Sequence, residues 1–293
     1  MAASTSVTSL QLPDSRALSY DVTAPSTDKA RPYVLLASPL CAPLATWDHV
    51  VPELVSQGFN VLRFDQPGHG SSGVPADLST TTFESMADDV HHLLKHLQIE
   101  KLYAWIGVSM GAATGIVYAA KYPGVIERLV PCDTISSSPV NAGTDDAFGP
   151  RVAVAREAGN LDASVEGTME RWFGRSWMET NVSESERMRK LMRSTSVDGF
   201  ETCCAALRSK TFDLRPLVTK AGAGVKSALL VVGANDANLP QSMQELRKGI
   251  EDGLKSKQGE SVSVELKVIE NAGHVLFIDG FTDFIKIITQ FLA

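Results

Sequence analysis

The feature that most constrains the fold is the pentapeptide at residues 107–111, which reads Gly-Val-Ser-Met-Gly. A strand-like run, Leu-Tyr-Ala-Trp-Ile, directly precedes it, and a helix-like run rich in small residues, 111–122, directly follows it. Glycines two positions before and two positions after Ser109 permit a sharp, strained turn at the serine. The sequence therefore predicts a strand–turn–helix unit that points the Ser109 hydroxyl out of the edge of a sheet.

Strand-like and helix-like segments alternate along most of the chain. Apolar runs typical of buried strands occur at 33–37 and 61–64, after two short strand-like pieces at 7–12 and 17–22. Further strand-like segments occur at 102–106, 126–132, 228–232 and 262–269. Residues 47–57, 83–97, 111–122 and 281–292 have the apolar spacing of helices. This order predicts an α/β fold, with a mostly parallel central sheet covered by helices on both faces.

The alternation stops between residues 136 and 218. That stretch holds helix-like segments at 151–157, 170–173 and 184–192 and no convincing strand. Because 293 residues are many for one compact core and few for two, we predict one domain with an insertion. Residues 1–135 and 219–293 would form the core. Residues 136–218 would form a helical cap over the carboxyl edge of the sheet, where open α/β sheets bind ligands.

The helix predicted at 83–97 has a start signal and a polar face. The tetrapeptide Thr81-Thr82-Phe83-Glu84 has the pattern of a capping box, and apolar residues at helical spacing follow it. His92 and His96 are one turn apart on this helix and could form a metal pair. Because no third ligand with a metal-site spacing accompanies them, a solvated helix face is the better interpretation, and we predict no metal.

A serine hydroxyl becomes a good nucleophile only when a base takes its proton. Among six histidines only His274 follows Ser109, and enzymes with this kind of turn carry serine, acid and histidine in that order. The acid should orient the imidazole and stabilise its charged form. Asp236 follows the strand at 228–232 and is the preferred candidate, while Asp133, after the strand at 126–132, is the rival.

An ester carbonyl under attack needs two fixed N–H donors for its oxygen. We expect one from Met110, the residue after the serine, and one from the loop at 38–41. Pro39 has no N–H, so Leu40 is the candidate in that loop. His69 lies in a glycine-rich turn at 65–72, ahead of the serine, and we predict that it braces the site.

Bulk properties limit the function classes. A formal net charge of -7 argues against non-specific binding to nucleic acid. The four cysteines lack paired CxxC spacing, which indicates reduced thiols packed in the core. The N-terminus lacks the pattern of a secretory signal, and no apolar run approaches the ~18 residues that span a bilayer. We therefore expect a cytoplasmic protein without a membrane partner.

Taken together, these residues resemble the α/β-hydrolase family and, within it, the 3-oxoadipate enol-lactonases. The resemblance begins near Tyr33 and covers most of the chain after it. It rests on D-x-x-G-x-G-x-S at 65–72, the segment 107–115, the cap segments 171–173 and 199–206, and the motifs at 233–236 and 272–274. One departure is clear: where those lactonases resemble N-S-L-G, this chain has Ser-Pro-Leu-Cys at 38–41.

The resemblance and the triad imply hydrolysis of a small lactone or ester through an acyl-enzyme, without metal or organic cofactor. Trp47, Trp172, Phe173 and Arg175 are candidates to line the pocket, and Arg175 could hold a substrate carboxylate, as an enol-lactonase-like reaction requires. Two alternatives stay open: carbon–carbon bond hydrolysis or cyclisation by the same triad, and a non-catalytic binding protein on the same scaffold. A homo-oligomer is also compatible with the sequence.

Overall fold

A computed structural model describes residues 8–25 and 31–293 of the chain. Eight strands form one sheet in the order β1-β2-β4-β3-β5-β6-β7-β8. The strands are β1 (Thr8–Gln11), β2 (Ala17–Thr23), β3 (Tyr33–Ala37), β4 (Asn60–Phe64), β5 (Leu102–Val108), β6 (Ile126–Cys132), β7 (Ser227–Gly233) and β8 (Glu265–Ile269). Residue 7, where the first strand was expected to begin, lies outside the described residues. The predicted mostly parallel α/β sheet is confirmed, since only β2 runs against its neighbours.

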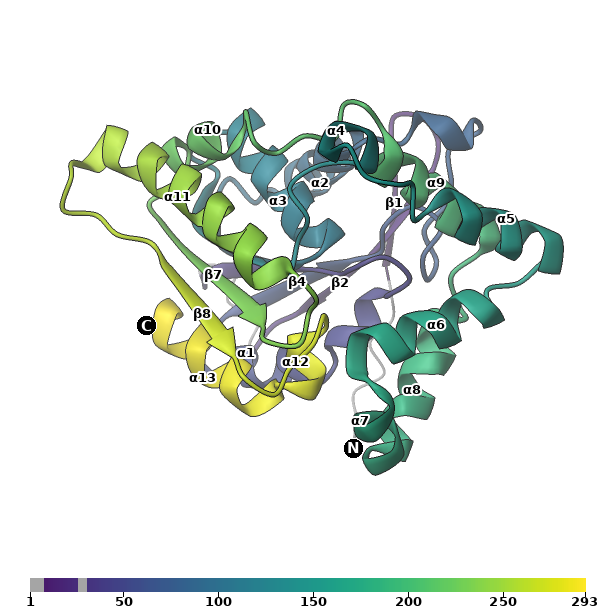
Figure 1. Cartoon of the computed structure of the whole chain (residues 1–293). Coiled ribbons are helices and arrows are strands. Elements are labelled where there is room, and N and C mark those ends of the chain that lie inside the picture. The colour runs from purple at the N-terminus through teal and green to yellow at the C-terminus, as the bar shows by residue number, and fades with distance from the viewer. Residues whose placement is uncertain (1–7, 26–30) are drawn as a thin grey trace.

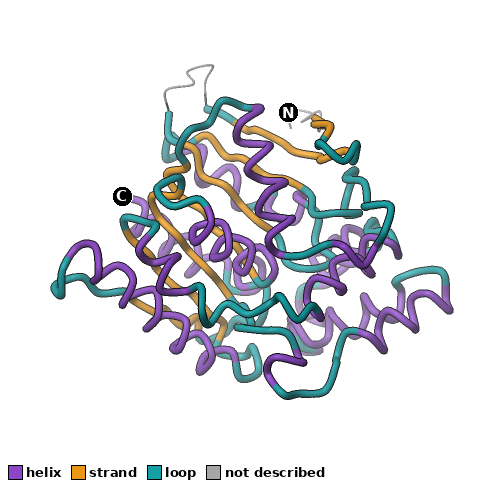
Figure 2. The backbone as a smooth tube through the Cα atoms, turned by 90° about the horizontal axis from the view of Figure 1, so that it is seen from above, coloured by secondary structure: helices purple, strands orange, loops and turns teal. Residues whose placement is uncertain are grey.

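Helices cover both faces of the sheet (Figure 1). One face carries α2 (Phe83–His96), α3 (Met110–Lys121), α10 (Val218–Ala223) and α11 (Leu239–Gln258), and the other carries α1 (Val50–Ser56), α12 (Leu276–Asp279) and α13 (Phe281–Leu292). Figure 2 shows helices of one layer crossing over the strands from above. The central strands are buried along nearly their whole length, which explains the continuous apolar sequences of β3 and β5.

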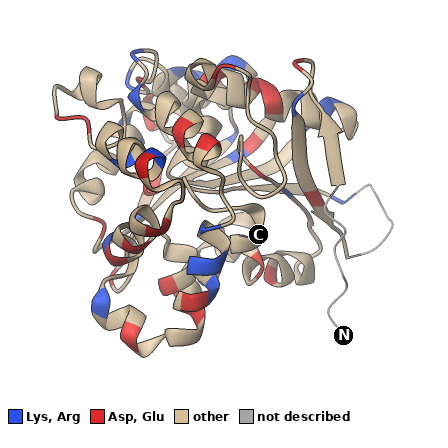
Figure 3. Ribbon diagram, turned by 90° about the vertical axis from the view of Figure 1, so that its right-hand side faces the viewer, with Lys and Arg blue, Asp and Glu red and all other residues tan. Residues whose placement is uncertain are grey.

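Between β6 and β7 the chain forms further helices and no named strand. They are α4 (Pro139–Ala142), α5 (Gly149–Ala158), α6 (Asp162–Phe173), α7 (Arg175–Thr180), α8 (Val182–Met192) and α9 (Val197–Arg208). Helices α5 to α8 project from one side of the core in Figure 1. In the view of Figure 3, basic and acidic residues are interspersed over the molecule rather than gathered into one basic face. In the described part of the chain, no helix has the length and apolar content needed to cross a bilayer.

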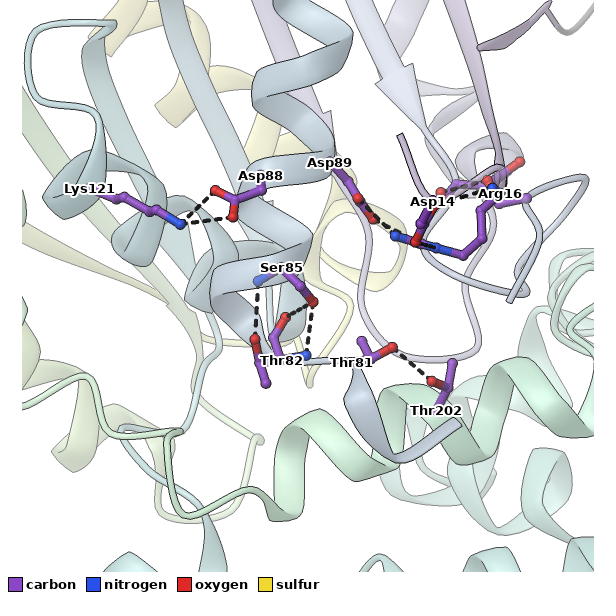
Figure 4. Close-up of polar contacts among 11 residues, drawn as sticks. Asp14, Arg16, Thr81, Thr82, Ser85, Asp88, Asp89, Lys121 and Thr202 are labelled. Carbon is purple, nitrogen blue, oxygen red and sulfur yellow. Dashed lines mark hydrogen bonds and ion pairs between the residues drawn. The ribbon is translucent and has the colours of Figure 1, made fainter. Parts of the chain in front are cut away.

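The cap of α2 is one residue later than the sequence pattern predicts. Thr82 is the N-cap and exchanges hydrogen bonds with Ser85, whereas Glu84 takes no part (Figure 4). The expectation of a Thr81–Glu84 box is wrong because the Thr81 hydroxyl is buried and hydrogen-bonds the Thr202 hydroxyl of α9 at 2.7 Å. A long-range contact therefore displaced the local cap.

The last strand is shorter than predicted, and a long helix precedes it. The sequence predicts a strand from residue 262, but β8 begins at Glu265. The Val264 amide donates to the Glu251 carboxylate of α11 at 3.0 Å, so it does not join the β-ladder. Helix α11, 20 residues long, has no counterpart among the helices expected from the sequence.

Candidate active site

Ser109 lies at the turn between β5 and α3, in the strained backbone conformation φ 55°, ψ −115°. The flanking glycines are required by close packing. A Cβ on Gly107 would lie 2.3 Å from the Gly111 carbonyl oxygen, and a Cβ on Gly111 would lie 2.2 Å from the Ala37 carbonyl oxygen. The Ser109 amide donates to the Cys132 carbonyl of β6 at 2.9 Å, which anchors the turn at the carboxyl edge of the sheet.

His274 and Asp236 form a close pair on the loops that follow β8 and β7. His274 Nδ1 and Asp236 Oδ2 are 2.6 Å apart, while His274 Nε2 makes no hydrogen bond to another described residue. Ser109, Asp236 and His274 all line one cavity of about 280 Å³. The Nδ1 contact requires a proton between imidazole and carboxylate, so neutral His274 presents the lone pair of Nε2 as a base.

Helix α6 holds the His274 loop in place. The Trp172 ring stacks on the His274 ring with centroids 5.4 Å apart, and the Trp172 carbonyl accepts the His274 amide at 3.3 Å. A Cβ on Gly273 would lie 2.0 Å from that same carbonyl oxygen, so only glycine fits between helix and loop. The Gly273 amide donates to Asp279 at 2.6 Å, which fixes the loop from its other side.

Two residues that line the cavity, Leu40 and Met110, have backbone amides without a protein acceptor in the described part of the chain. Cys41 beside Leu40 has φ 65°, a left-handed conformation in which glycine is favoured. The Cys41 amide donates to His69 Nε2 at 2.8 Å, so it is not available to a substrate oxygen.

His69 is a buried scaffold residue, as its place in the sequence indicates. Its Nδ1 donates to the Pro67 carbonyl at 3.0 Å, and its Nε2 accepts from Cys41. Both hydrogen bonds require the neutral ring with its proton on Nδ1. Burial lowers the pKa of His69 to about 4. The side chain therefore stays neutral at physiological pH and supports the backbone that carries the Leu40 amide.

Of the two candidate acids, Asp236 pairs with the His274 imidazole and Asp133 does not. Asp133 follows β6, is fully buried, and accepts the Gly233 amide on Oδ1 at 2.9 Å. Burial, followed by the nearby Asp236, raises the pKa of Asp133 well above its ordinary value. Burial also raises the pKa of Asp279 to about 6.

Three of the four expected pocket residues do not line the cavity. Trp172 does. Trp47 is fully buried in the core, where it stacks on Phe277 with centroids 3.7 Å apart. Phe173 packs on Trp177 instead. Arg175, the expected carboxylate ligand, does not line the cavity; its side chain is 77% exposed and pairs with Glu170 at 2.6 Å.

Two arginines that the sequence reasoning missed line the cavity, Arg151 of α5 and Arg171 of α6. Arg151 donates to the Thr168 hydroxyl at 2.8 Å, and Arg171 is exposed and also borders a shallower hollow between the two helices. All other arginines in the described ranges pair with a carboxylate, apart from Arg31, which donates to a backbone carbonyl. The only sequence feature that points to Arg151 or Arg171 as a pocket residue is that Arg171 directly precedes Trp172.

The polar groups considered as metal ligands do not gather into a site. Within residues 8–25 and 31–293, no group of three or more His, Cys, Asp or Glu side chains could hold a metal ion. His91 stacks on Tyr122 with ring centroids 3.9 Å apart, and His92 is exposed. All four cysteines are free and buried.

Comparisons with known proteins agree with this geometry. The family described as "alpha/beta hydrolase fold" matches residues 32–281. The 3-oxoadipate enol-lactonase 2 of Acinetobacter baylyi is 27% identical over 206 residues, which cover 70% of this chain and 72% of the relative. A putative carbamate hydrolase RutD of Agrobacterium fabrum is 28% identical over 229 residues, covering 75% and 81%. The crystal structure of the enol-lactonase from Burkholderia xenovorans superposes with a TM-score of 0.83 and 26% identity, over 97% of this chain and 99% of that one. The chain belongs to the α/β-hydrolase family.

Proposed function

We propose that this protein hydrolyses a small carboxylic ester or lactone through an acyl-enzyme on Ser109. One observation carries the proposal. A serine on a strained strand–helix turn shares a cavity with a histidine that is hydrogen-bonded to a carboxylate. This is the geometry in which a serine hydroxyl becomes a nucleophile. The similarity to two enol-lactonases supports the choice of ester or lactone as substrate.

The reaction takes two steps. The Ser109 oxygen forms a bond to the carbonyl carbon while its proton passes to His274 Nε2, and Asp236 stabilises the imidazolium. The Leu40 and Met110 amides bind the oxygen that becomes negative. His274 then gives the proton to the departing alkoxide, which in a lactone stays attached to the acyl chain. Water next loses a proton to His274 and attacks the acyl carbon. The bond from that carbon to the Ser109 oxygen then breaks, and His274 returns the proton to Ser109.

The cavity favours a substrate that carries a negative group beside an apolar part. Much of its lining is apolar, including Phe83, Ile135 and Phe148, whereas Arg151 and Arg171 hold unpaired positive charge. A carboxylate is bound well by guanidinium groups in such a position. We assign to these two arginines the role that the sequence suggested for Arg175. Residues 136–218 would act as the cap that supplies them.

The test is a panel of matched esters and lactones, with and without a carboxylate, followed by proton release. Wild type should be active, and Ser109→Ala should be at background. Arg151→Gln and Arg171→Gln should each raise KM for the anionic substrates about tenfold or more and leave neutral ones nearly unchanged. Arg175→Gln is the matched control and should change neither.

Equal activity of wild type and Ser109→Ala would refute the proposal. If wild type has no ester or lactone activity, vinylogous diketones should be assayed next, since the same triad can hydrolyse carbon–carbon bonds. Tight retention of a ligand without turnover would instead favour a binding protein.

A further inference from the structure

A second aspartate lies directly behind Asp236. Asp133 is the first residue after β6 and has φ 43°, and its side chain is fully buried. Its Oδ1 accepts the Gly233 amide, which ties it to the end of β7, three residues before Asp236. Its Oδ2 is buried, and no group in the described part of the chain donates a hydrogen bond to it. One oxygen of this carboxyl group is therefore satisfied and the other has no donor.

The charges around Asp133 are the wrong sign for an ionised carboxylate. The titratable groups that face it are Asp236, Asp279 and the thiol of Cys132, and within the described ranges no lysine or arginine pairs with it. An unpaired carboxylate in a dry interior takes up a proton rather than remain charged. Of the two carboxyl groups, Asp236 has a donor at its Oδ2, His274 Nδ1, whereas Asp133 Oδ2 has none in the described part of the chain, so a proton is more stable on Asp133.

We propose that Asp133 is a neutral carboxylic acid that donates its Oδ2 proton to Asp236 and so positions the acid of the triad. Asp236 then holds the single negative charge, with one side of its carboxylate on His274 and the other on Asp133. After burial, the nearness of Asp236 is a cause that raises the pKa of Asp133, which agrees with two carboxyl groups that share one charge. In this arrangement Asp133 is a positioning residue, since it acts only through Asp236.

The two protonation states of Asp133 predict opposite results for Asp133→Asn. An asparagine can still accept from Gly233 and donate its N–H to Asp236, so it mimics a neutral acid. The acid limb of kcat/KM, which reports His274, should then stay within about 0.3 pH units of wild type, with kcat within about threefold. If Asp133 were ionised, removing its charge would lower the pKa of His274 and move that limb down by about one pH unit.

Asp133→Leu keeps the volume but cannot donate. In this variant Asp236 loses a donor and becomes more basic, so the acid limb of kcat/KM should move to higher pH. We expect kcat to fall about tenfold or more and KM to change little. Arg171 and Asp279 also act electrostatically on Asp236, but neither is altered in this comparison. If Asp133 had only a structural role, its substitution would reduce the amount of folded enzyme and leave the acid limb of kcat/KM at the same pH.

A direct measurement separates this inference from the proposed function, on which the kinetic readouts rest. Infrared difference spectra between wild type and Asp133→Asn at pH 7, with aspartate labelled by ¹³C, should show the loss of one protonated carboxyl band. This measurement requires no substrate. Loss of an ionised carboxylate band instead would overturn the inference even if the enzyme is active, and a protonated band would uphold it even if no ester is hydrolysed.

Discussion

Protonation of one buried imidazole should control much of the acid sensitivity of the fold. His69 is fully buried, and its two ring nitrogens hold the Cys41 amide and the Pro67 carbonyl. Protonation would put a hydrogen on Nε2, which then could no longer accept from Cys41. Burial, which disfavours the charged ring, keeps the pKa of His69 near 4 in the folded protein, whereas the unfolded chain has the ordinary value of 6.5.

The sign and size of the effect follow from this difference. Below pH 6.5, His69 takes up a proton in the unfolded chain but not in the folded protein. The free energy of unfolding therefore falls as the pH drops from about 6.5 to 4. At ~1.4 kcal/mol per pH unit the full loss is about 3 kcal/mol, of which about 2 kcal/mol should appear between pH 7 and pH 5. Asp133 and Asp279, whose pKa values are raised, act in the opposite direction.

Urea unfolding of wild type and His69→Gln at pH 7 and pH 5 isolates the contribution of His69, because the aspartates contribute equally to both proteins. Wild type should lose about 2 kcal/mol more than the variant over this interval. His92→Gln, which alters an exposed histidine, is the control and should match wild type. Equal pH dependence of wild type and His69→Gln would refute the assignment of a depressed pKa to His69.

Three further substitutions test separate parts of the account. Gly273→Ala should reduce kcat at least tenfold and destabilise the fold by about 1–3 kcal/mol, because its Cβ meets the Trp172 carbonyl; activity and thermal unfolding check this. Trp47→Ala should cost about 3–5 kcal/mol in chemical unfolding, yet leave KM unchanged, because Trp47 lies in the core. Asp236→Asn should lower kcat about 10³–10⁴-fold, and Asp133→Asn far less; the reverse ranking would sink the assignment of the acid.

Those parts of the molecule that depend on local patterns were predictable from sequence. The strand–turn–helix unit around Ser109 follows from two glycines and the runs that flank them. His274 is the only histidine after Ser109, and the structure pairs it with Asp236. Strands β3 and β6 have the bounds expected; in β3 a continuous apolar run, typical of a buried parallel strand, sets them.

Features that depend on how separate elements pack against one another were not predictable. Thr81 looks like a helix cap until Thr202, from another helix, takes its hydroxyl. Arg175 resembles a substrate ligand in the sequence, but its side chain forms an ion pair with Glu170. Arg151 and Arg171 differ from the other arginines between β6 and β7 only in that they form no ion pair with a carboxylate in the described part of the chain. Which charges are left unpaired depends on the packing of helices, and no pattern within a single segment encodes it.

The central claim is that Ser109 is the nucleophile, and covalent labelling tests it most directly. A fluorophosphonate should react with the Ser109 oxygen, which forms a bond to phosphorus as fluoride leaves and His274 takes the serine proton. Intact mass and peptide mapping should then show a single adduct on the peptide that carries Ser109, absent from Ser109→Ala and formed much more slowly in His274→Ala. An adduct on another residue, or an unlabelled wild type that nevertheless hydrolyses esters, would contradict the claim.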